Sequence, residues 1–231
     1  MTAILSNLQA TREAIAQAAK AAQRDVTNVR LLAVSKTFPA QAVREAYQAG
    51  QTAFGENYLQ EALDKMAQLK DLPLEWHFIG PIQSNKTRPI AENFAWVHSV
   101  DRLKIAERLS AHRPQQLPSL NICLQVNVSG EASKSGVAPE EVMQLARDVA
   151  QLPQLKLRGL MAIPAPAGDD AAQRAPFALM RQLLEELNRQ GLSLDTLSMG
   201  MSHDYPAAIQ EGATIVRIGT AIFGGRSKPP A

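Results

Sequence analysis

The chain has 231 residues, of which 45% are hydrophobic and 20% are charged, as in an ordinary soluble globular protein. Its formal net charge of +2 gives no reason to expect nucleic acid as a partner, and its one cysteine, Cys123, excludes an internal disulfide and a multi-cysteine metal site. Because Arg12 and Glu13 interrupt the first 22 residues, we expect neither a signal peptide nor a membrane span there, and therefore a cytosolic (cytoplasmic) protein without a membrane partner.

The first half of the chain alternates helical and extended patterns. An Ala-rich helix is predicted at 2–22, before the first strand. Gly50 is suited to end the next helix, and Asp101 is suited to cap a later one. The predicted strands are 30–35, 52–54, 74–79 and 96–98, and the helices that follow them are 40–49, 58–69, 85–93 and 101–112.

The second half continues the same alternation. A polar loop at 129–136 follows the fifth strand, and Pro139 suits the first turn of the next helix, where its missing N–H costs nothing. The predicted strands are 120–128, 156–160, 194–197 and 214–218. Helices are predicted from Pro139 onward, at 170–190 and at 203–211, with a last helical turn within 219–225 and a frayed tail at 227–231.

Strict alternation of strands and helices predicts a parallel sheet. Eight such units can close into a (β/α)8 TIM barrel, an α/β fold for which roughly 250 residues is typical. A doubly wound open sheet is the competing architecture, and hydrophobic periodicity alone does not separate the two. Because no Gly- and Ser-rich linker divides the chain, we predict one domain over 1–231, with a flexible tail from about residue 226.

The first predicted strand ends at a lysine, Lys36. In a barrel, every loop that follows a strand opens on the same face, so Lys36 would share a pocket with Asn57 and with the loops after strands seven and eight. A lysine at the mouth of a barrel can lose solvent, which lowers its pKa and makes it usable as a Schiff-base nucleophile. A solvated lysine just past a strand end is the plain alternative.

The last two strand ends carry residues suited to binding a phosphate. Gly200 and Gly219 allow backbone N–H groups to approach an anion, and Ser202 and Thr220 offer hydroxyl groups where we expect each to open a short helix. Taken singly, these residues are explained by a cap or a turn, whereas together they favour a phosphate site. Arg217 shares a strand face with Gly219, so we predict that it faces the pocket.

Other motifs carry less weight. Residues 80–87 resemble a P-loop, but Asn85 replaces its second glycine and Pro81 removes a backbone donor. We expect His77 to be a buried, hydrogen-bonded side chain rather than a catalytic one, and the four histidines lack metal-ligand spacing. Cys123 is predicted to be a core residue.

A set of motifs in chain order extends over nearly the whole sequence. They are AVSK at 33–36, FGENY at 54–58, WHFIG at 76–80, QSNK at 83–86, SKSG at 133–136, RGLM at 158–161, SMGMS at 198–202 and RIGTAIFG at 217–224. With these motifs the chain resembles the YggS/PROSC-type pyridoxal phosphate homeostasis proteins, a family related to the N-terminal barrel of alanine racemase. One visible departure is His203, where the family pattern suggests a small or acidic residue.

The resemblance implies a single barrel like that of alanine racemase, with pyridoxal phosphate (PLP) bound covalently to Lys36 as an internal aldimine. Ser202, Gly219 and Thr220 match the positions that bind the phosphate, and Asn57 matches a pocket position near the cofactor ring.

Arg217 matches the arginine that faces the pyridine nitrogen in the racemase relatives, with the phosphate as the alternative contact. An arginine there keeps the ring nitrogen unprotonated and weakens the ring as an electron sink, which suits restrained chemistry. A racemase also needs a second acid/base group from a separate β domain, for which we expect no room in 231 residues. The resemblance therefore implies a monomeric PLP-binding protein without defined catalytic turnover.

Such a protein would hold, buffer or deliver PLP and so maintain PLP and amino-acid or keto-acid homeostasis. Delivery would be to PLP-dependent apo-enzymes, with Lys134 as a candidate acceptor amine and a solvated surface lysine as the alternative. Two further hypotheses stay open at this point. One is a weak PLP-dependent racemase or lyase, and the other is a cofactor-free Schiff-base aldolase acting on a sugar phosphate.

Overall fold

The eight strands form a closed parallel barrel. The structure is a computed structural model and describes residues 2–130 and 135–225. The strands pair in chain order and β8 pairs with β1, where Arg30 lies opposite Ile215 and Ala33 lies opposite Ile218. The strands are β1 (Arg30–Val34), β2 (Ala53–Glu56), β3 (Glu75–Phe78), β4 (Trp96–Val100), β5 (Leu120–Gln125), β6 (Leu155–Met161), β7 (Thr196–Ser198) and β8 (Ile215–Ile218). The predicted (β/α)8 TIM barrel is confirmed, and the open doubly wound sheet is excluded by the β1–β8 pairing.

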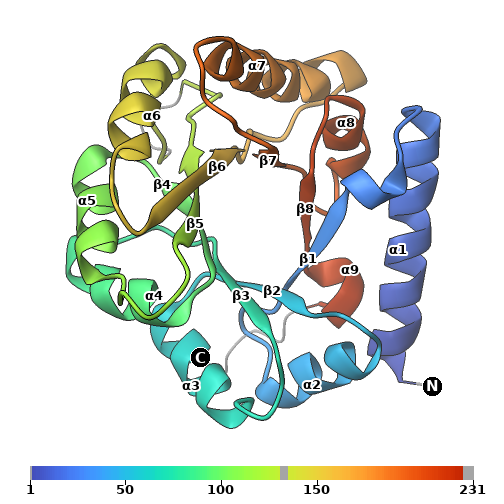
Figure 1. Cartoon of the computed structure of the whole chain (residues 1–231). Coiled ribbons are helices and arrows are strands. Elements are labelled where there is room, and N and C mark those ends of the chain that lie inside the picture. The colour runs from blue at the N-terminus through green and yellow to red at the C-terminus, as the bar shows by residue number, and fades with distance from the viewer. Residues whose placement is uncertain (1, 131–134, 226–231) are drawn as a thin grey trace, which may run out of the picture.

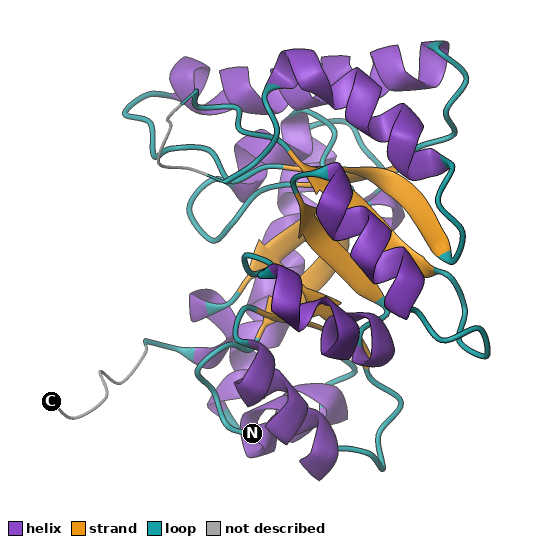
Figure 2. Ribbon diagram, turned by 90° about the vertical axis from the view of Figure 1, so that its left-hand side faces the viewer, coloured by secondary structure: helices purple, strands orange, loops and turns teal. Residues whose placement is uncertain are grey.

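Helices surround the barrel, as the view along its axis shows (Figure 1). Seen from the side, the tilted strands lie between helices on opposite flanks (Figure 2). The α-helices are α1 (Ala3–Ala21), α2 (Ala40–Gln48), α3 (Leu59–Gln68), α4 (Thr87–Asn93), α5 (Leu103–His112), α6 (Val142–Ala150), α7 (Asp170–Arg189), α8 (Tyr205–Gln210) and α9 (Thr220–Phe223), and the short 3-10 helices are η1 (Val26–Asn28), η2 (Ser84–Lys86) and η3 (Pro139–Glu141). None of the helices within the described residues is long and apolar enough to cross a membrane.

The N-terminal helix α1 occupies the place of the eighth outer helix. Helix α9, which follows β8, has only four residues and is too short to cover the neighbouring strands. Helix α1 packs against α2, α8 and α9 and so fills this place in the ring (Figure 1). Its buried residues Leu8, Thr11, Ile15 and Ala19 recur at helical spacing, which explains why this segment is an amphipathic helix.

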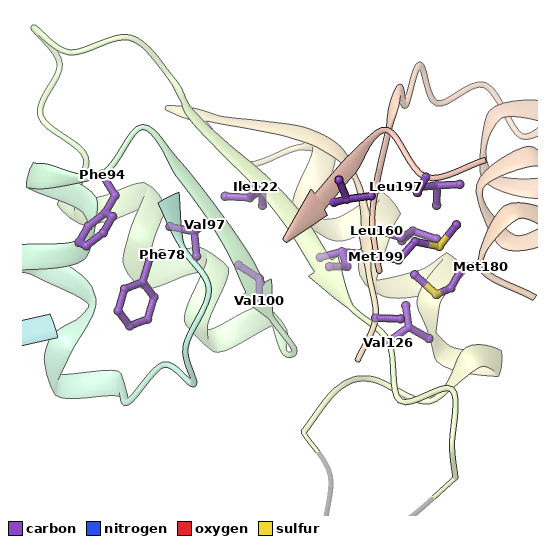
Figure 3. Packing of buried hydrophobic residues seen from close by; sticks show 14 of the residues in the cluster. Phe78, Phe94, Val97, Val100, Ile122, Val126, Leu160, Met180, Leu197 and Met199 are labelled. Atoms are coloured by element: carbon purple, nitrogen blue, oxygen red, sulfur yellow. The ribbon is translucent and has the colours of Figure 1, made fainter. Parts of the chain in front are cut away.

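The buried apolar residues form two layers. The larger layer lies between the strands and the helices, where Phe78 and Phe94 meet edge-on with their ring centroids 5.3 Å apart, and Met180 of α7 lies beside Leu160 and Met199 (Figure 3). The smaller layer combines residues from six strands, Leu32, Ala53, Trp96, Cys123, Met161 and Ile215, and it fills the barrel interior. Burial of Cys123 agrees with its prediction as a core residue.

Some predicted strand ends differ from those in the structure. Strand β2 extends to Glu56 instead of ending at Phe54, since the Glu56 side chain is buried and bonded inside the protein. Strand β5 ends at Gln125 instead of continuing to 128, and Val126 makes only an isolated bridge with Val137.

The prediction that Asp101 caps a helix is wrong. Helix α5 begins at Leu103, its N-cap position is Arg102, and no side chain caps it. The Asp101 carboxylate instead lies 2.6 Å from the Arg102 guanidinium, so its charge is partnered before it could reach a helix N–H. The predicted flexible tail lies outside the described residues.

Candidate functional site

The six predicted site residues line one cavity of about 210 Å³ at the C-terminal ends of the strands. They come from four different strand ends and are Lys36, Asn57, Ser202, Arg217, Gly219 and Thr220. The remaining wall consists of Val34, Ile79, Ile163, Met201 and His203. A larger cavity of about 360 Å³ lies at the opposite end of the barrel, beside Arg30 and Gln51, and Lys36 does not line it. The barrel architecture places functional loops on the face that holds the smaller cavity.

Lys36 follows β1 in a turn whose backbone is held from outside the loop. Its neighbour Thr37 adopts a φ of +68°, which is strained for a β-branched residue by about 1–3 kcal/mol. The Thr37 N–H donates to Glu61 Oε1 of α3 at 2.6 Å. This contact stabilises the strained turn, and so fixes where the lysine leaves the backbone.

A buried ion pair lies beneath the same turn. Lys65 Nζ lies 2.5 Å from Glu56 Oε1 and donates to the Ser35 carbonyl at 2.7 Å. The Ser35 hydroxyl donates to Glu56 Oε1 at 2.6 Å, and Lys65 also contacts Glu61 at 2.8 Å. Burial raises the pKa of Glu56, while the nearby Lys65 opposes that rise. This network was not predicted from the sequence, although Lys65 lies at helical spacing from two apolar residues, Ala62 of α3 and the helix C-cap Leu69, which are both buried.

The loop after β7 is compact at Gly200. This residue has a φ of +93°, and a Cβ there would lie 2.7 Å from Ala208 Cβ and 3.0 Å from Tyr205 Cα. The Met201 N–H donates to the Asp204 carboxylate at 2.5 Å, which closes the loop. Ser202 does not open a helix as predicted, because α8 begins at Tyr205 and its N-cap is Asp204. The exposed Ser202 hydroxyl instead lies at the rim of the cavity.

The end of β8 agrees with the predicted arrangement. Gly219 is the N-cap of α9, and Thr220 is its first residue, with N–H groups that have no acceptor within the helix. A Cβ at Gly219 would lie 2.9 Å from the Val34 carbonyl oxygen, so only glycine lets β8 approach β1 here. Small backbone groups therefore form this side of the cavity.

Arg217 faces the cavity, as predicted, and is almost fully buried. Its NH1 group donates to Ser198 Oγ at 2.8 Å, and its NH2 group donates to the Ala162 carbonyl at 2.9 Å. Burial lowers the pKa of Arg217 to about 10, which still leaves the guanidinium charged at neutral pH. The cavity thus contains a fixed cation that is bonded to two neutral groups, the Ser198 hydroxyl and the Ala162 carbonyl.

Asn57 supplies a buried polar atom that has no hydrogen-bond partner in the described part of the chain. Its Oδ1 is inaccessible to solvent and accepts no hydrogen bond from the described residues. The main chain of Asn57 is packed against Gly80, where a Cβ would lie only 2.3 Å from the Asn57 carbonyl oxygen. The glycine of the P-loop-like segment therefore serves this close approach, and residues 84–86 form a 3-10 turn instead of a phosphate loop.

The histidines form no metal site with other residues that the structure describes. His77 is buried and hydrogen-bonded, as expected, but its bond to His98 across β3 and β4 was not predicted. Within residues 2–130 and 135–225, no cluster of three or more His, Cys, Asp or Glu side chains could hold a metal ion. His203 is half exposed, and its Nε2 lies 3.4 Å from Asp204 Oδ2. Lys134 lies outside the described residues.

Comparisons with known proteins agree with this architecture. The family model for the N-terminal domain of alanine racemase matches residues 6–227. The chain is 68% identical to a protein of Pseudomonas aeruginosa named pyridoxal phosphate homeostasis protein, over 98% of this chain and 97% of that one. It is 51% identical to the Escherichia coli K12 protein of the same name, over 98% of each chain.

Solved structures give the same picture. The structure of PipY from Synechococcus elongatus with PLP bound matches with a TM-score of 0.84 at 42% identity, over 96% of this chain and all of that one. An alanine racemase from Corynebacterium glutamicum shares the fold at 20% identity and a TM-score of 0.67, over 96% of this chain but 60% of the racemase. This chain therefore belongs to the family of the pyridoxal phosphate homeostasis proteins, whose barrel is that of the alanine racemase N-terminal domain.

Proposed function

We propose that this protein holds PLP in the cavity at the C-terminal end of the barrel, as a Schiff base on Lys36, and buffers or delivers it. The observation that carries the proposal is the meeting of Lys36 with a buried cation, Arg217, and a glycine-lined strand end at Gly219 in one small cavity. The relative from Synechococcus elongatus, described with PLP bound, supports the same cofactor.

The residues present fit PLP on chemical grounds. The orphan Asn57 Oδ1 offers a buried acceptor that a cofactor hydroxyl could satisfy, and unpaired buried acceptors are costly in proteins. The hydroxyls of Ser202 and Thr220, with the backbone around Gly219, suit the phosphate. Arg217 suits the ring nitrogen or the phosphate, because either one accepts a hydrogen bond from a guanidinium. When bound, PLP supplies an aldehyde that forms a Schiff base with amines.

A holding role is favoured over catalysis by the other groups in the cavity. Racemisation needs a second acid/base group opposite the lysine, and such a group typically contributes about 10²- to 10⁴-fold in rate. Among the described lining residues, His203 is the one besides Lys36 whose side chain commonly serves as a general acid or base in enzymes. Its exposed position and its contact with Asp204 make it a poor candidate for a shielded second base. We therefore propose a carrier without defined turnover.

The experiment that tests the proposal is reduction of the PLP-treated protein with borohydride, followed by peptide mapping. We expect the cofactor mass on the peptide that contains Lys36, and loss of both this label and the long-wavelength absorption band in Lys36→Ala. Lys70→Ala, which changes an exposed lysine, is the control and should retain both. Absence of the band in the unaltered protein after PLP addition would refute the proposal and favour a cofactor-free aldolase.

Delivery and assembly need separate measurements. Transfer of PLP to an apo-enzyme faster than PLP leaves into buffer would support delivery, and an unchanged rate in Lys134→Ala would dismiss that lysine as the acceptor. We further propose that the protein acts as a monomer in the cytosol. Elution at a dimer mass in size-exclusion chromatography would contradict the first part, and fractionation of cells tests the second.

A further inference from the structure

A line of four side-chain hydrogen bonds crosses the interior of the barrel and ends at the cavity. Glu75 Oε1 lies 2.7 Å from His77 Nε2, and His77 Nδ1 lies 2.9 Å from His98 Nε2. His98 Nδ1 lies 2.7 Å from Ser198 Oγ, which accepts from Arg217 NH1 at 2.8 Å. The two histidines and Ser198 are completely buried, so water does not compete for these bonds.

The direction of this line follows from its two ends. Arginine can only donate, so the Ser198 oxygen accepts from Arg217 and its O–H is available for His98 Nδ1. An ionised carboxylate can only accept, so His77 must donate from Nε2 to Glu75. The hydrogen bond to His77 lowers the pKa of Glu75 to about 2, which agrees with an ionised carboxylate.

The histidines between these ends must then be neutral and share one tautomer. Burial lowers the pKa of His77, and lowers that of His98 well below its usual value. A neutral His77 that donates from Nε2 accepts at Nδ1, so His98 donates from its Nε2 and accepts at Nδ1. In all four hydrogen bonds the donor therefore lies on the Arg217 side and the acceptor on the Glu75 side. Each bond has one proton and one acceptor atom.

Charged and titratable groups also surround the line. Arg30 of β1 lies 2.7 Å from Glu75 and opposes protonation of His77. Arg217 of β8 and His77 oppose protonation of His98. The Cys123 thiol of β5 is neutral, because burial raises its pKa to about 12. Burial and the two arginines favour the neutral rings that the directional line requires, and they act against Glu75, which favours the protonated form of His77.

We propose that four positioning residues hold the Arg217 guanidinium in place at the wall of the PLP cavity. They are Glu75, His77, His98 and Ser198, and their hydrogen bonds form a one-way line that extends from Arg217 to the opposite end of the barrel. The proposal rests on the proposed function, because it assigns Arg217 to the wall of a PLP site. Arg217 is anchored at NH1 by Ser198 and at NH2 by the Ala162 carbonyl. The orientation of its remaining N–H groups toward the cavity depends on both anchors.

Through this line, Glu75 affects the anchoring of Arg217 in the cavity although it does not line the cavity. If Glu75 no longer accepts, His77 is free to exchange tautomers, and the opposite tautomer of His98 would donate from Nδ1 to Ser198. The Ser198 oxygen would then accept from both His98 and Arg217, while its own proton would need another partner. The anchor of Arg217 weakens as a result, although no residue that lines the cavity has changed.

The first part of the test locates the ring protons in the unaltered protein. Nitrogen–proton correlation spectra of the histidine side chains, recorded with and without PLP, distinguish the two tautomers of His77 and His98. His112→Gln and His203→Gln assign the other two of the four histidines. We expect Nε2–H on both buried rings. A proton on Nδ1 of either ring at neutral pH would overturn the proposed direction.

The second part measures PLP affinity and the position of its absorption band in Glu75→Leu. We expect affinity on the order of tenfold weaker, the loss typical of one hydrogen bond to a charged group, with a shifted band and mixed tautomers. Asp71→Leu is the control, because it breaks the Arg44–Asp71 ion pair outside the line, and should leave PLP binding unchanged. If Glu75→Leu fails to fold, Ser198→Ala removes the anchor of Arg217 with a smaller change, and the same loss is expected.

The outcomes separate this inference from the function it rests on. If the unaltered protein binds PLP and both Glu75→Leu and Ser198→Ala bind it with unchanged affinity and spectrum, the positioning role is overturned while the PLP site stands. If the unaltered protein does not bind PLP, the proposed function fails and the positioning role fails with it. Weaker binding in both variants, with Asp71→Leu unaffected, supports the inference.

Discussion

The buried Glu56–Lys65 pair gives the sharpest test of how the lysine turn is held. Both side chains are almost inaccessible, at 0% and 4% exposure, and the Lys65 ammonium lies 2.5 Å from the carboxylate. In Lys65→Met the Glu56 carboxylate would keep only the Ser35 hydroxyl, since its other oxygen has no partner among the described residues. Removing one partner of a buried ion pair costs about 3–5 kcal/mol, and we expect this loss of stability at neutral pH.

The loss should depend on pH with a definite sign. Burial already raises the pKa of Glu56 in the folded protein, and removal of Lys65 raises it further. A carboxyl group whose pKa is higher in the folded than in the unfolded state takes up a proton on folding. Its contribution to stability therefore falls as the pH rises from the unfolded pKa toward the folded one. The deficit of Lys65→Met should be smaller at about pH 5 than at about pH 8.

Urea unfolding followed by tryptophan fluorescence measures this effect, because Trp76 and Trp96 are both buried. Lys70→Met removes an exposed lysine and should change stability by less than about 0.5 kcal/mol. The double variant Lys65→Met with Glu56→Gln should recover part of the loss, because no buried charge then lacks a partner. The reasoning is refuted if Lys65→Met is as stable as Lys70→Met, or if its deficit is the same at both pH values.

Three further predictions follow from close contacts and burial. Gly219→Ala places a Cβ 2.9 Å from the Val34 carbonyl oxygen. A spectral titration should show PLP binding at least about tenfold weaker, and unchanged affinity would contradict this. Gly159→Ala places a Cβ 1.8 Å from the Thr196 carbonyl oxygen and should destabilise the protein by about 3 kcal/mol or more, seen as a lower Tm. Burial raises the pKa of the Cys123 thiol to about 12. A thiol reagent at about pH 8 should therefore modify Cys123 only after the protein unfolds, and rapid reaction of the folded protein would contradict this.

The sequence predicted the barrel units well because their signals are local. Alternating apolar runs and helical patterns, separated by residues such as Gly50, depend on neighbours in the chain. Closure could not be decided in this way, because an open sheet has the same alternation. It depends on the pairing of Arg30 with Ile215 and of Ala33 with Ile218, which joins the first strand to the last. The motif resemblance, rather than periodicity, favoured the closed form.

The cavity residues were predictable because barrel topology brings strand ends together, whereas the groups that support them were not. Lys36 follows β1 and Arg217 lies one residue before the end of β8, so their common face followed from the fold. The line from Arg217 through Ser198 to the histidines depends on which inward-facing positions lie at the same height across different strands. Strand tilt and register set those heights, and neither is visible in the sequence.

The polar line and the apolar layer of the barrel interior have different consequences for the cavity. Leu32 and Met161 fill space without direction, so the same volume could be packed in other ways. Arg217 has neutral hydrogen-bond partners in Ser198 and Ala162, and burial of a cation without a directly bonded carboxylate is costly. A phosphorylated ligand beside Arg217 would offset that cost and would bind a guanidinium that is already oriented. A preorganised and buried cation of this kind favours tight retention of an anionic ligand.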